Sequence, residues 1–497
     1  MGNRGVRILW LASGFTLLVC MAALLALSRR FPYGANMADR PILLLVALLI
    51  AASLPYFASI LLALKRGPVA CLLPWIFLCG LGMRALLLPS APILEDDSFR
   101  YLWDGAVTAN GFNPYAYVPD DLLQGEGAPD RLRQLASEAG IIFQRINHPW
   151  LSTIYPPGAQ FIFAIAHTLV PWSLAALKFL YLVIDVCTFT VLLRALHATG
   201  LPATHVVIYW WNPLLIKEFY NSAHMDVLLM PLLAALLLAM LTNSAWRGGL
   251  LLSLAMATKI WPVLFAPLLT CACARSNLWR AILAVCALGA GAALLVPLAA
   301  SRVHGEASGL AAYGNGWEMN DALFMLFPWL TAQGSSLFGG DLAPALAHRA
   351  GRMAATGIVA FVMLWQALRW VRVEQGQVHR NAFLPRALLI ITATLFLVSP
   401  TQFPWYFSWM LPFLVFVPSP GLLLLTATLP LYYLRFYLDA RDHVALFHHG
   451  VVWIEFVPVW LVLAWAWWRA RSASKHADRH ADAMQNFAAP LAGSDPS

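Results

Sequence analysis

The sequence predicts an all-α, polytopic membrane protein with about twelve transmembrane helices, and three observations support this fold class. Of the 497 residues, 60% are hydrophobic and only 11% are charged, whereas a soluble chain averages about 25% charged residues. The mean hydropathy is +0.69. Apolar runs of about 20 residues, the length that crosses a bilayer as a helix, recur along the chain. This composition excludes a soluble enzyme, a secreted disulfide scaffold and a disordered protein.

Basic residues set the expected orientation. The net charge of +8 comes from Lys and Arg at the ends of apolar runs, among them Arg4, Lys65, Arg66 and Arg469, and not from a basic stripe that would bind nucleic acid. By the positive-inside rule, these residues mark the cytoplasmic face. We expect a multi-pass plasma (inner) membrane protein with both termini in the cytoplasm. The cysteines lie in or beside apolar runs, so no disulfide framework is expected.

The chain divides into three expected parts. Residues 1–66 contain two N-terminal transmembrane helices, at 8–28 and 41–63, residues 67–471 form the main membrane domain, and residues 472–497 form a disordered cytoplasmic tail. A third helix, at 69–90, leads to a long outer loop. Further spans are expected at 175–193, 204–219, 226–242, 280–299, 354–370, 383–399, 404–417, 420–438 and 450–468.

Three apolar segments do not fit a simple span. The segment 158–171 has only about 14 residues, roughly 21 Å as a helix, so a re-entrant or interfacial helix is expected there. In 248–271, Lys259 and Pro262 interrupt the apolar run, which favours a helical hairpin, with a straight span as the alternative. The sequence does not decide the course of 322–338.

The outer loop at 91–157 inverts the global charge. Nine of the 24 acidic residues lie in it, against four arginines. An acidic outer loop on a basic protein agrees with the predicted orientation.

The strongest candidate for catalysis is the acidic run Glu95, Asp96 and Asp97 at the start of this loop. Adjacent carboxylates repel one another, so at least one is expected to have a raised pKa. A carboxylate at a membrane surface can act as general base on an acceptor hydroxyl. The alternative is a helix cap before Ser98, since acids are favoured at a helix start; capping needs only one acid.

Other residues of the loop suit a sugar ligand, because aromatic rings stack on its C–H surface and polar side chains bind its hydroxyls. Turn formation and the membrane-interface belt explain many of the same residues. The substrate-binding candidates in this loop are Arg100, Tyr101, Asp104, Asn113, Tyr115, His148 and Tyr155.

A second polar cluster, predicted to share the outer face, lies between two apolar runs. Glu218, Asn221 and His224 are spaced three apart, so one helical face could carry all three. With Asp226 they suggest a metal or phosphate site, although the spacing matches no specific metal signature. A hydrogen-bonded polar turn is the alternative.

Several cations in apolar surroundings need partners. Lys259, in the middle of an apolar run, is costly unless it is paired; a phosphate, Asp185 or Glu218 could serve. Arg84 could be a snorkelling side chain. At the outer ends of later spans, Arg435, Arg441, His448 and His449 could hold an anion or form rim salt bridges with Asp439 or Asp442.

Taken as a set, these residues resemble the GT-C class of integral membrane glycosyltransferases, specifically the mannosyltransferase-like branch that uses polyprenyl-phosphate sugars. The resemblance covers most of the chain after residue 80, and two helices precede the usual first one. It rests on Glu95-Asp96-Asp97 with Arg100 to Gly105, Gly111 to Tyr115, Asn147-His148-Pro149 to Pro157, Trp211 to Leu214, His224-Met225-Asp226, Ala257 to Pro262, and Ser399-Pro400 to Pro404-Trp405-Tyr406.

The resemblance implies a GT-C-like fold with a large first outer loop. It further implies transfer of a hexose, with mannose favoured, from a polyprenyl-phosphate donor to a lipid or glycan acceptor on the extracytoplasmic face. One of Glu95, Asp96 and Asp97 would be the general base, the anomeric carbon would be inverted, and Trp405 and Tyr406 would join the substrate-binding residues. A cation such as Lys259, His224 or Arg435 would stabilise the departing phosphate.

The sequence requires no cofactor, although clustered carboxylates would accept Mg²⁺ or Mn²⁺. One competing function is a carrier or flippase of lipid-linked sugars, for which the expected internal repeats are not found. The other is an O-antigen-type polymerase or ligase, which would be expected to rely on outer-loop arginines.

Overall fold

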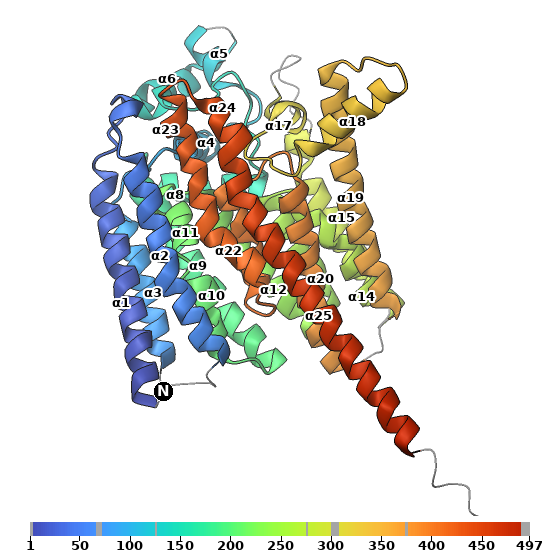
Figure 1. Ribbon diagram of the computed structural model, residues 1–497. Coiled ribbons are helices and arrows are strands. Elements are labelled where there is room, and N and C mark those ends of the chain that lie inside the picture. Colours follow the sequence, from blue (N-terminus) through green and yellow to red (C-terminus); the bar gives the residue numbers. More distant parts are fainter. Residues whose placement is uncertain are drawn as a thin grey trace, which may run out of the picture.

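The structure is a computed structural model that describes residues 3–65, 72–124, 127–274, 277–299, 308–372 and 376–488. In this part of the chain, regular structure is helical apart from one bridge between Met319 and Thr401. The predicted all-α class is therefore confirmed. The helices stand side by side as a bundle (Figure 1), and we call the end that carries residues 91–157 the loop end.

Eight helical stretches are long and apolar enough to cross a membrane, and nine if one bent pair is counted. They run together from the loop end to the opposite end (Figure 1). The single-helix stretches are α1 (Asn3–Ser28), α2 (Ile42–Lys65), α9 (Leu174–Thr199), α19 (Pro344–Arg372) and α20 (Gln377–Val398). The composite stretches are α15 (Leu278–Leu294) with α16 (Val296–Ala299), α22 (Pro420–Thr428) with η9 (Leu429–Tyr433) and α23 (Leu434–Asp439), and α24 (Val444–Leu446) with η10 (Phe447–Val451) and α25 (Val452–Ala488).

The other apolar runs form shorter or broken helices, so fewer continuous spans appear than the dozen expected. The single span expected at 204–219 is wrong. Asn212-Pro213 interrupts it, because proline removes a backbone donor and disfavours helix at the residue before it. The run divides into η3 (Ala203–Val206), α10 (Val207–Trp210), α11 (Pro213–Ile216) and the π-helix η4 (Lys217–Asn221).

After η4 the chain turns sharply into η5 (Met225–Leu229) and α12 (Met230–Leu241). The helical direction changes by 111° between Pro213–Asn221 and Met225–Leu241. Ala223 lies between them with φ of 62°, a conformation that is uncommon for a residue with a side chain. The bend places the polar residues 217–226 inside the protein.

The segment 248–271 forms the predicted hairpin. Its arms are α13 (Ala245–Thr258) and η6 (Trp261–Phe265) with α14 (Ala266–Ala274), and Lys259 lies at the turn. A Cβ on Gly248 would lie 2.8 Å from Leu269 Cδ1, whereas a straight helix would separate these residues by about 30 Å. The prediction of a hairpin is confirmed and that of a straight span is excluded.

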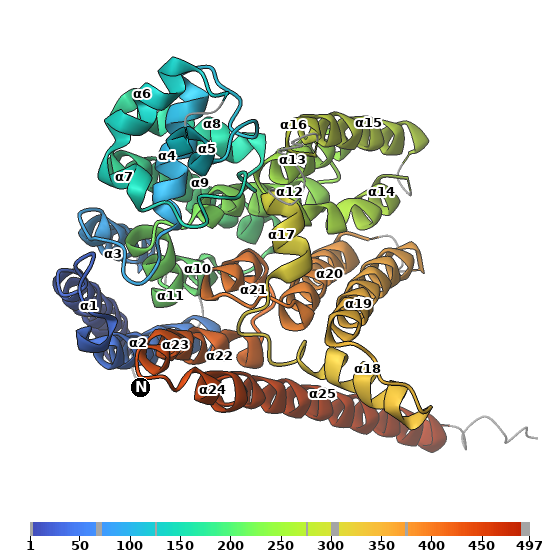
Figure 2. The same ribbon diagram turned by 90° about the horizontal axis from the view of Figure 1, so that it is seen from above.

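The long loop folds at the loop end as a helical layer with its own apolar core. It contains α4 (Asp97–Ala109), α5 (Pro119–Gln124), α6 (Asp130–Ala139) and α7 (Ile141–Gln144), which Figure 2 shows grouped beside α8 (Pro157–Leu169). α8 is the short helix expected at 158–171, and it is not long enough to be a span. A Cβ on Gly105 would lie 2.4 Å from the Phe163 carbonyl oxygen, so α4 and α8 pack closely.

Two further segments complete the loop end and the core. α17 (Gly309–Gly316) and α18 (Leu326–Leu337), which forms most of the segment left open at 322–338, lie toward the loop end (Figure 1). The run at 404–417 forms η8 (Pro404–Met410) and α21 (Leu411–Leu414), which are buried. α3 (Leu73–Leu87) leads into the acidic run.

The C-terminal tail differs from expectation. α25 continues to Ala488, where the sequence predicted disorder from residue 472. Residues 472–488 are rich in good helix formers and contain no Gly or Pro, so nothing in them ends the helix. The rest of the expected tail, 489–497, lies outside the described residues. The start of α1 and the end of α25 lie at the end of the bundle opposite the loop end (Figure 1).

Candidate functional site

The acidic run marks the point where α3 gives way to α4. Asp96 occupies the N-cap position of α4, but its side chain makes no capping hydrogen bond. The Asn147 amide nitrogen instead donates to Asp96 Oδ1 at 2.9 Å and to Asp97 Oδ1 at 2.7 Å. The helix-cap alternative therefore explains where the helix begins but not how these two carboxylates are used.

Asp97 contacts Tyr101 of its own helix and residues from two other parts of the chain. Its Oδ2 accepts a hydrogen bond from Tyr101 at 3.4 Å and lies 3.6 Å from His224 Nδ1. Burial would raise the pKa of Asp97, but His224 and Asn147 outweigh it and lower the pKa below the usual value. Asp97 is thus an ionised carboxylate in a fixed position at neutral pH.

The two neighbouring acids behave differently. Burial and the charge of Asp97 raise the pKa of Asp96 to about 6. Burial also raises the pKa of Glu95, against the influence of Lys217, and Glu95 Oε1 is buried without a hydrogen-bond partner. The prediction that at least one of the three acids has a raised pKa is confirmed.

His224 links Asp97 to the interior. Its Nε2 lies 3.4 Å from Glu218 Oε2, so the ring stands between two carboxylates. Glu218 also accepts a hydrogen bond from Tyr433 at 2.5 Å and pairs with Lys217. All of these side chains except the Asp97 carboxylate are buried.

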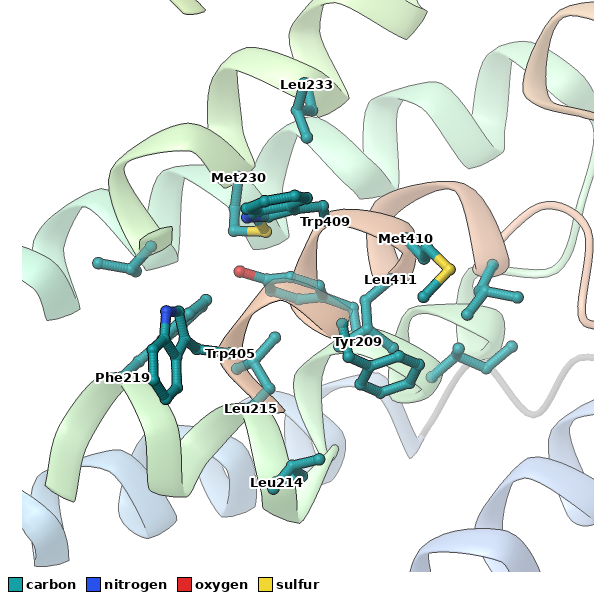
Figure 3. Packing of buried hydrophobic residues seen from close by; sticks show 14 of the residues in the cluster. Tyr209, Leu214, Leu215, Phe219, Met230, Leu233, Trp405, Trp409, Met410 and Leu411 are labelled. Carbon is teal, nitrogen blue, oxygen red and sulfur yellow. The ribbon is translucent and has the colours of Figure 1, made fainter. Parts of the chain in front are cut away.

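An aromatic wall adjoins His224. The Trp405 ring stacks on the imidazole with centroids 3.8 Å apart, and Tyr406 stacks on Trp409 at 4.3 Å. The Tyr406 hydroxyl is 2.8 Å from that of Tyr313 on α17. Figure 3 shows Trp405 and Trp409 projecting from η8 into the buried core. The predicted residues Trp405 and Tyr406 are thereby brought to the acidic run.

Lys259 is paired with Asp226. Its Nζ lies 2.6 Å from Asp226 Oδ1, which also accepts a hydrogen bond from Trp409 Nε1 at 2.5 Å. The partners suggested from the sequence, Asp185 and Glu218, are wrong, because each pairs with another buried cation. The bend after η4 turns Asp226 toward the tip of the α13–α14 hairpin, which the sequence could not show.

Asn221 does not share a helical face with Glu218 and His224, although the sequence spacing predicted it. Its amide nitrogen donates to the Ala91 carbonyl at 2.8 Å, and its Oδ1 accepts from Ile93 N at 3.2 Å. The expectation of one helical face was wrong because residues 217–221 form a π-helix and the chain then bends. Asn221 holds the segment before the acidic run in place.

Arg100 and Asp104 join α4 to the chain before α8. They form a buried ion pair at 3.0 Å, and Arg100 also donates to the Leu151 carbonyl. Asp104 Oδ2 accepts from Thr153 at 2.5 Å and from Gln160 at 3.1 Å. These contacts use both side chains to fix α4, the helix that carries Asp97.

Three more predicted residues shape the loop. Asn113 Oδ1 accepts a hydrogen bond from Tyr115 N at 2.9 Å, which forms a local turn, and the Tyr115 hydroxyl donates to the Tyr155 carbonyl at 2.8 Å. The Tyr155 ring packs edge-on against Tyr101, with centroids 4.9 Å apart. Asn113 and Tyr115 thus hold the loop conformation, while Tyr155 reaches the residue beside Asp97.

His148 lies at the loop end against Trp317, with ring centroids 4.6 Å apart. Its φ is 47°. Burial lowers its pKa, with Arg100 acting in the same direction and Asp97 in the opposite one.

The sequence suggested that Arg84 could be a snorkelling side chain, but the structure shows otherwise. It is fully buried, with Nε 2.7 Å from Asp185 Oδ2 and Nη1 donating to the Trp210 carbonyl at 2.7 Å. The error arose because Asp185 lies 101 residues away in the sequence.

The rim salt bridges considered for Arg435 and Arg441 with Asp439 and Asp442 are not found among the described residues. Arg441 instead donates to the Ala38 carbonyl at 2.9 Å.

No group of three or more His, Cys, Asp or Glu side chains that could hold a metal ion is present in the residues that the structure describes.

The structure adds contacts that sequence reasoning missed. Asn147 holds Asp96 and Asp97, and Tyr433 and Trp409 complete the partners of Glu218 and Asp226. Asn147 belongs to the Asn147-His148-Pro149 motif, of which only His148 is a predicted substrate-binding residue. An amide beside a candidate base could have been suspected, whereas the two aromatic residues gave no local signal.

Comparison with known proteins supports the resemblance. Residues 38–275 match the model of a family described as alpha-(1->6)-mannopyranosyltransferase, N-terminal domain. An alpha-(1->6)-mannopyranosyltransferase A of Mycobacterium tuberculosis is 26% identical over 361 residues, which cover 66% of this chain and 62% of the relative. A protein of the same name from Corynebacterium glutamicum is 25% identical over 193 residues, 37% of this chain and 36% of the relative.

The chain thus spans less than two thirds of the length of either relative. No solved structure matches it. These matches confirm the resemblance to a mannosyltransferase-like membrane glycosyltransferase.

Proposed function

We propose, from the premise that this chain resembles an alpha-(1->6)-mannopyranosyltransferase over residues 38–275, that it is a membrane glycosyltransferase. It transfers mannose from a polyprenyl-phosphate donor to a lipid or glycan acceptor. The names of the two relatives support mannose. The observation that carries the proposal is the Asp97 carboxylate, which Asn147, Tyr101 and His224 hold in position beside an aromatic wall.

The chemistry is a direct displacement. Asp97 takes the proton from the acceptor hydroxyl, the hydroxyl oxygen forms a bond to the anomeric carbon, and the bond from that carbon to the lipid phosphate breaks with inversion. Asp97 suits the role of base because it is ionised and fixed, so no reorganisation is needed during reaction. The ring of Trp405, which stacks on both His224 and Phe403, holds the imidazole in place beside Asp97.

The buried groups behind Asp97 maintain it as a base. His224 stands between Asp97 and Glu218, and Glu218 is fixed by Lys217 and Tyr433. The Lys259–Asp226 pair fixes the tip of the α13–α14 hairpin beside Trp409. We assign Lys259 to this role in preference to phosphate binding, since a carboxylate already partners it.

The loop end faces the extracytoplasmic side in this proposal. The acidic character of residues 91–157 and the basic residues at the ends of the first and last spans support that orientation. Both termini then lie in the cytoplasm, in agreement with their position at the same end of the bundle (Figure 1).

The test is transfer of labelled mannose from polyprenyl-phosphate mannose by the purified protein. Wild type is compared with Asp97→Asn, Asp96→Asn and, as a matched control, Asp130→Asn, which removes an exposed acid of α6. Transfer that is lost in Asp97→Asn and kept in Asp130→Asn supports the proposal. Full activity of Asp97→Asn removes the proposed base, and movement of intact donor across proteoliposomes without transfer would favour a carrier.

A further inference from the structure

One cation beside the acidic run has no hydrogen-bond partner in the part of the chain that the structure describes. Arg145 follows α7 and lies two residues before Asn147, the residue that holds Asp96 and Asp97. Among the described residues, none accepts a hydrogen bond from the Arg145 guanidinium or forms an ion pair with it, and its Nε is buried without a partner. A buried donor without an acceptor is costly, so it calls for a ligand or another physical explanation.

Aromatic rings hold this guanidinium in place. Its central carbon lies 3.9 Å from the centre of the Phe99 ring and 4.1 Å from the centre of the Tyr33 ring. Such contacts occupy the flat face of the guanidinium and leave its edge, where the N–H donors lie, available. Phe99 belongs to α4, two residues after Asp97, so Arg145 is fixed relative to the proposed base.

The local charge favours an anionic ligand. Burial is the main influence that lowers the pKa of Arg145, and the charge of the nearby Arg40 acts in the same direction. Tyr33 and Asp96 act in the opposite direction. Arg40 donates from Nη2 to the Pro32 and Ala35 carbonyls and has no carboxylate partner among the described residues. Two arginines thus stand together, and Asp96 is the carboxylate among the described residues that offsets the charge of Arg145.

The N-terminal helices gain a role from this arrangement. Tyr33 and Arg40 lie in the connection between α1 and α2, the two helices that precede the usual first helix of the resembled class. Tyr33 is 61% exposed, so its ring contributes little to a core. Its contact with Arg145 is the feature that connects this hairpin to the acidic run.

We propose that Arg145, positioned by Phe99 and Tyr33, binds a phosphate group of the substrate at the mouth of the acidic site. The planar guanidinium fork matches phosphate geometry and can donate two parallel hydrogen bonds to it. The inference rests on the proposed function, and it deepens that function by naming the side chain that binds the phosphate. Lys259 and Lys217 could bind a phosphate only by giving up their carboxylate partners.

The first test is binding of a polyprenyl phosphate without sugar, compared with the corresponding polyprenol without phosphate. Wild type should bind the phosphate more tightly than the alcohol, and Arg145→Gln should lose about ten- to a hundredfold of the affinity for the phosphate only. Arg131→Gln, which removes an α6 arginine paired with Glu138, is the matched control and should bind as wild type does. Equal affinities of wild type and Arg145→Gln for the phosphate would overturn the proposal.

The second test examines how the arginine is held. Tyr33→Ala should raise the KM for a phosphate-bearing substrate with a smaller change in kcat, while Tyr33→Phe, which keeps the ring, should resemble wild type. A raised KM for the donor identifies the lipid phosphate as the ligand, and a raised KM for a phosphorylated acceptor identifies that source. If neither KM changes in Arg145→Gln, the inference is wrong.

The two proposals fail separately. Wild type that transfers mannose while Arg145→Gln matches it in binding and KM would leave the function standing and remove the phosphate site. If the wild type binds polyprenyl phosphate through Arg145 but transfers no mannose, the phosphate site stands and the proposed function is wrong.

Discussion

Two groups of buried charges in this protein have opposite designs. At Arg84 and Asp185, both carboxylate oxygens are in use: Oδ2 contacts Arg84 at 2.7 Å and Tyr220 at 3.0 Å, and Oδ1 accepts from Tyr209 at 2.5 Å. At Asp97, Oδ1 accepts from Asn147 at 2.7 Å, but the contacts of Oδ2 to Tyr101 and His224 are longer, at 3.4 and 3.6 Å. Protein groups use both oxygens of the Asp185 carboxylate, although Arg84 Nη2 has no partner among the described residues, whereas the Asp97 carboxylate keeps capacity for a ligand.

The two groups also differ in how far their side chains are buried. Arg84 and Asp185 are fully buried, whereas the Asp97 side chain is 26% exposed. A buried ion pair between two helices holds them together, and removal of one partner leaves a costly unpaired charge. A partly exposed, under-satisfied carboxylate is typical of a functional site. Mutations in the two groups should therefore separate stability from activity.

The largest expected effect is on activity. Asp97→Asn should reduce mannose transfer by about 10²–10⁴-fold, the usual contribution of a general base, with little change in apparent Tm. Transfer assays and thermal unfolding of the purified protein measure the two quantities. If Asp97→Asn lowered the Tm but kept normal transfer per folded molecule, Asp97 would contribute to stability and not to catalysis, which would contradict the account.

The next effect is on stability. Asp185→Asn should destabilise the protein by roughly 3–5 kcal/mol, because Arg84 remains buried without a counter-charge. The activity of the molecules that remain folded should be kept. Glu138→Gln, which breaks the exposed pair with Arg131, is the control and should cost about 1 kcal/mol or less. Equal effects of these two variants would contradict the contrast between buried and exposed pairs.

Asn147 should show an intermediate effect on activity. Asn147→Ala removes the donors that hold Asp96 and Asp97, and hydrogen bonds to charged groups contribute about 1.5–3 kcal/mol, so transfer should fall about ten- to a hundredfold. Asn110→Ala, in the same loop, removes an amide that bonds only to Ala106 and Arg131 among the described residues and should leave transfer unchanged. Kinetics of both variants check this prediction.

The smallest expected effect concerns pH and stability. The pKa of Asp96 in the folded protein is about 6, above its usual 3.8, so the folded state binds this proton more tightly than the unfolded chain. The resulting stability is present below about pH 4 and is lost as pH rises through 6. The Tm of Asp96→Asn should therefore rise relative to wild type between pH 4 and 6.5. A constant difference over this range would show that Asp96 does not titrate there.

Local sequence patterns predicted the fold class, the hairpin at Lys259 and a raised pKa within the acidic run. These features depend on composition, on a charge within an apolar run and on adjacent acids. The partners of Arg84, Lys259 and Glu218 were not predictable in the same way. Arg84 meets Asp185 from another helix, 101 residues away, and Lys259 meets Asp226 after the chain bends between η4 and η5. A single sequence does not show which buried charges the fold brings together.

The helix breaks illustrate the same limit. Apolar content at 204–219 predicted a continuous span, but η3, α10, α11 and η4 replace it. Pro213 signalled a break, yet it did not indicate that the polar residues 217–226 would be enclosed. Enclosure places His224 between Asp97 and Glu218, and it includes the contact of His224 with Trp405 of η8, 181 residues later.

The pH dependence of kcat/KM for mannose transfer tests most directly whether Asp97 is the base. If it is, the acid limb of the profile lies below the usual pKa of an aspartate, because the Asp97 pKa is lowered, and the limb stays in place in Asp96→Asn. An acid limb near pH 6 that disappears in Asp96→Asn would assign the base to Asp96 and contradict the account.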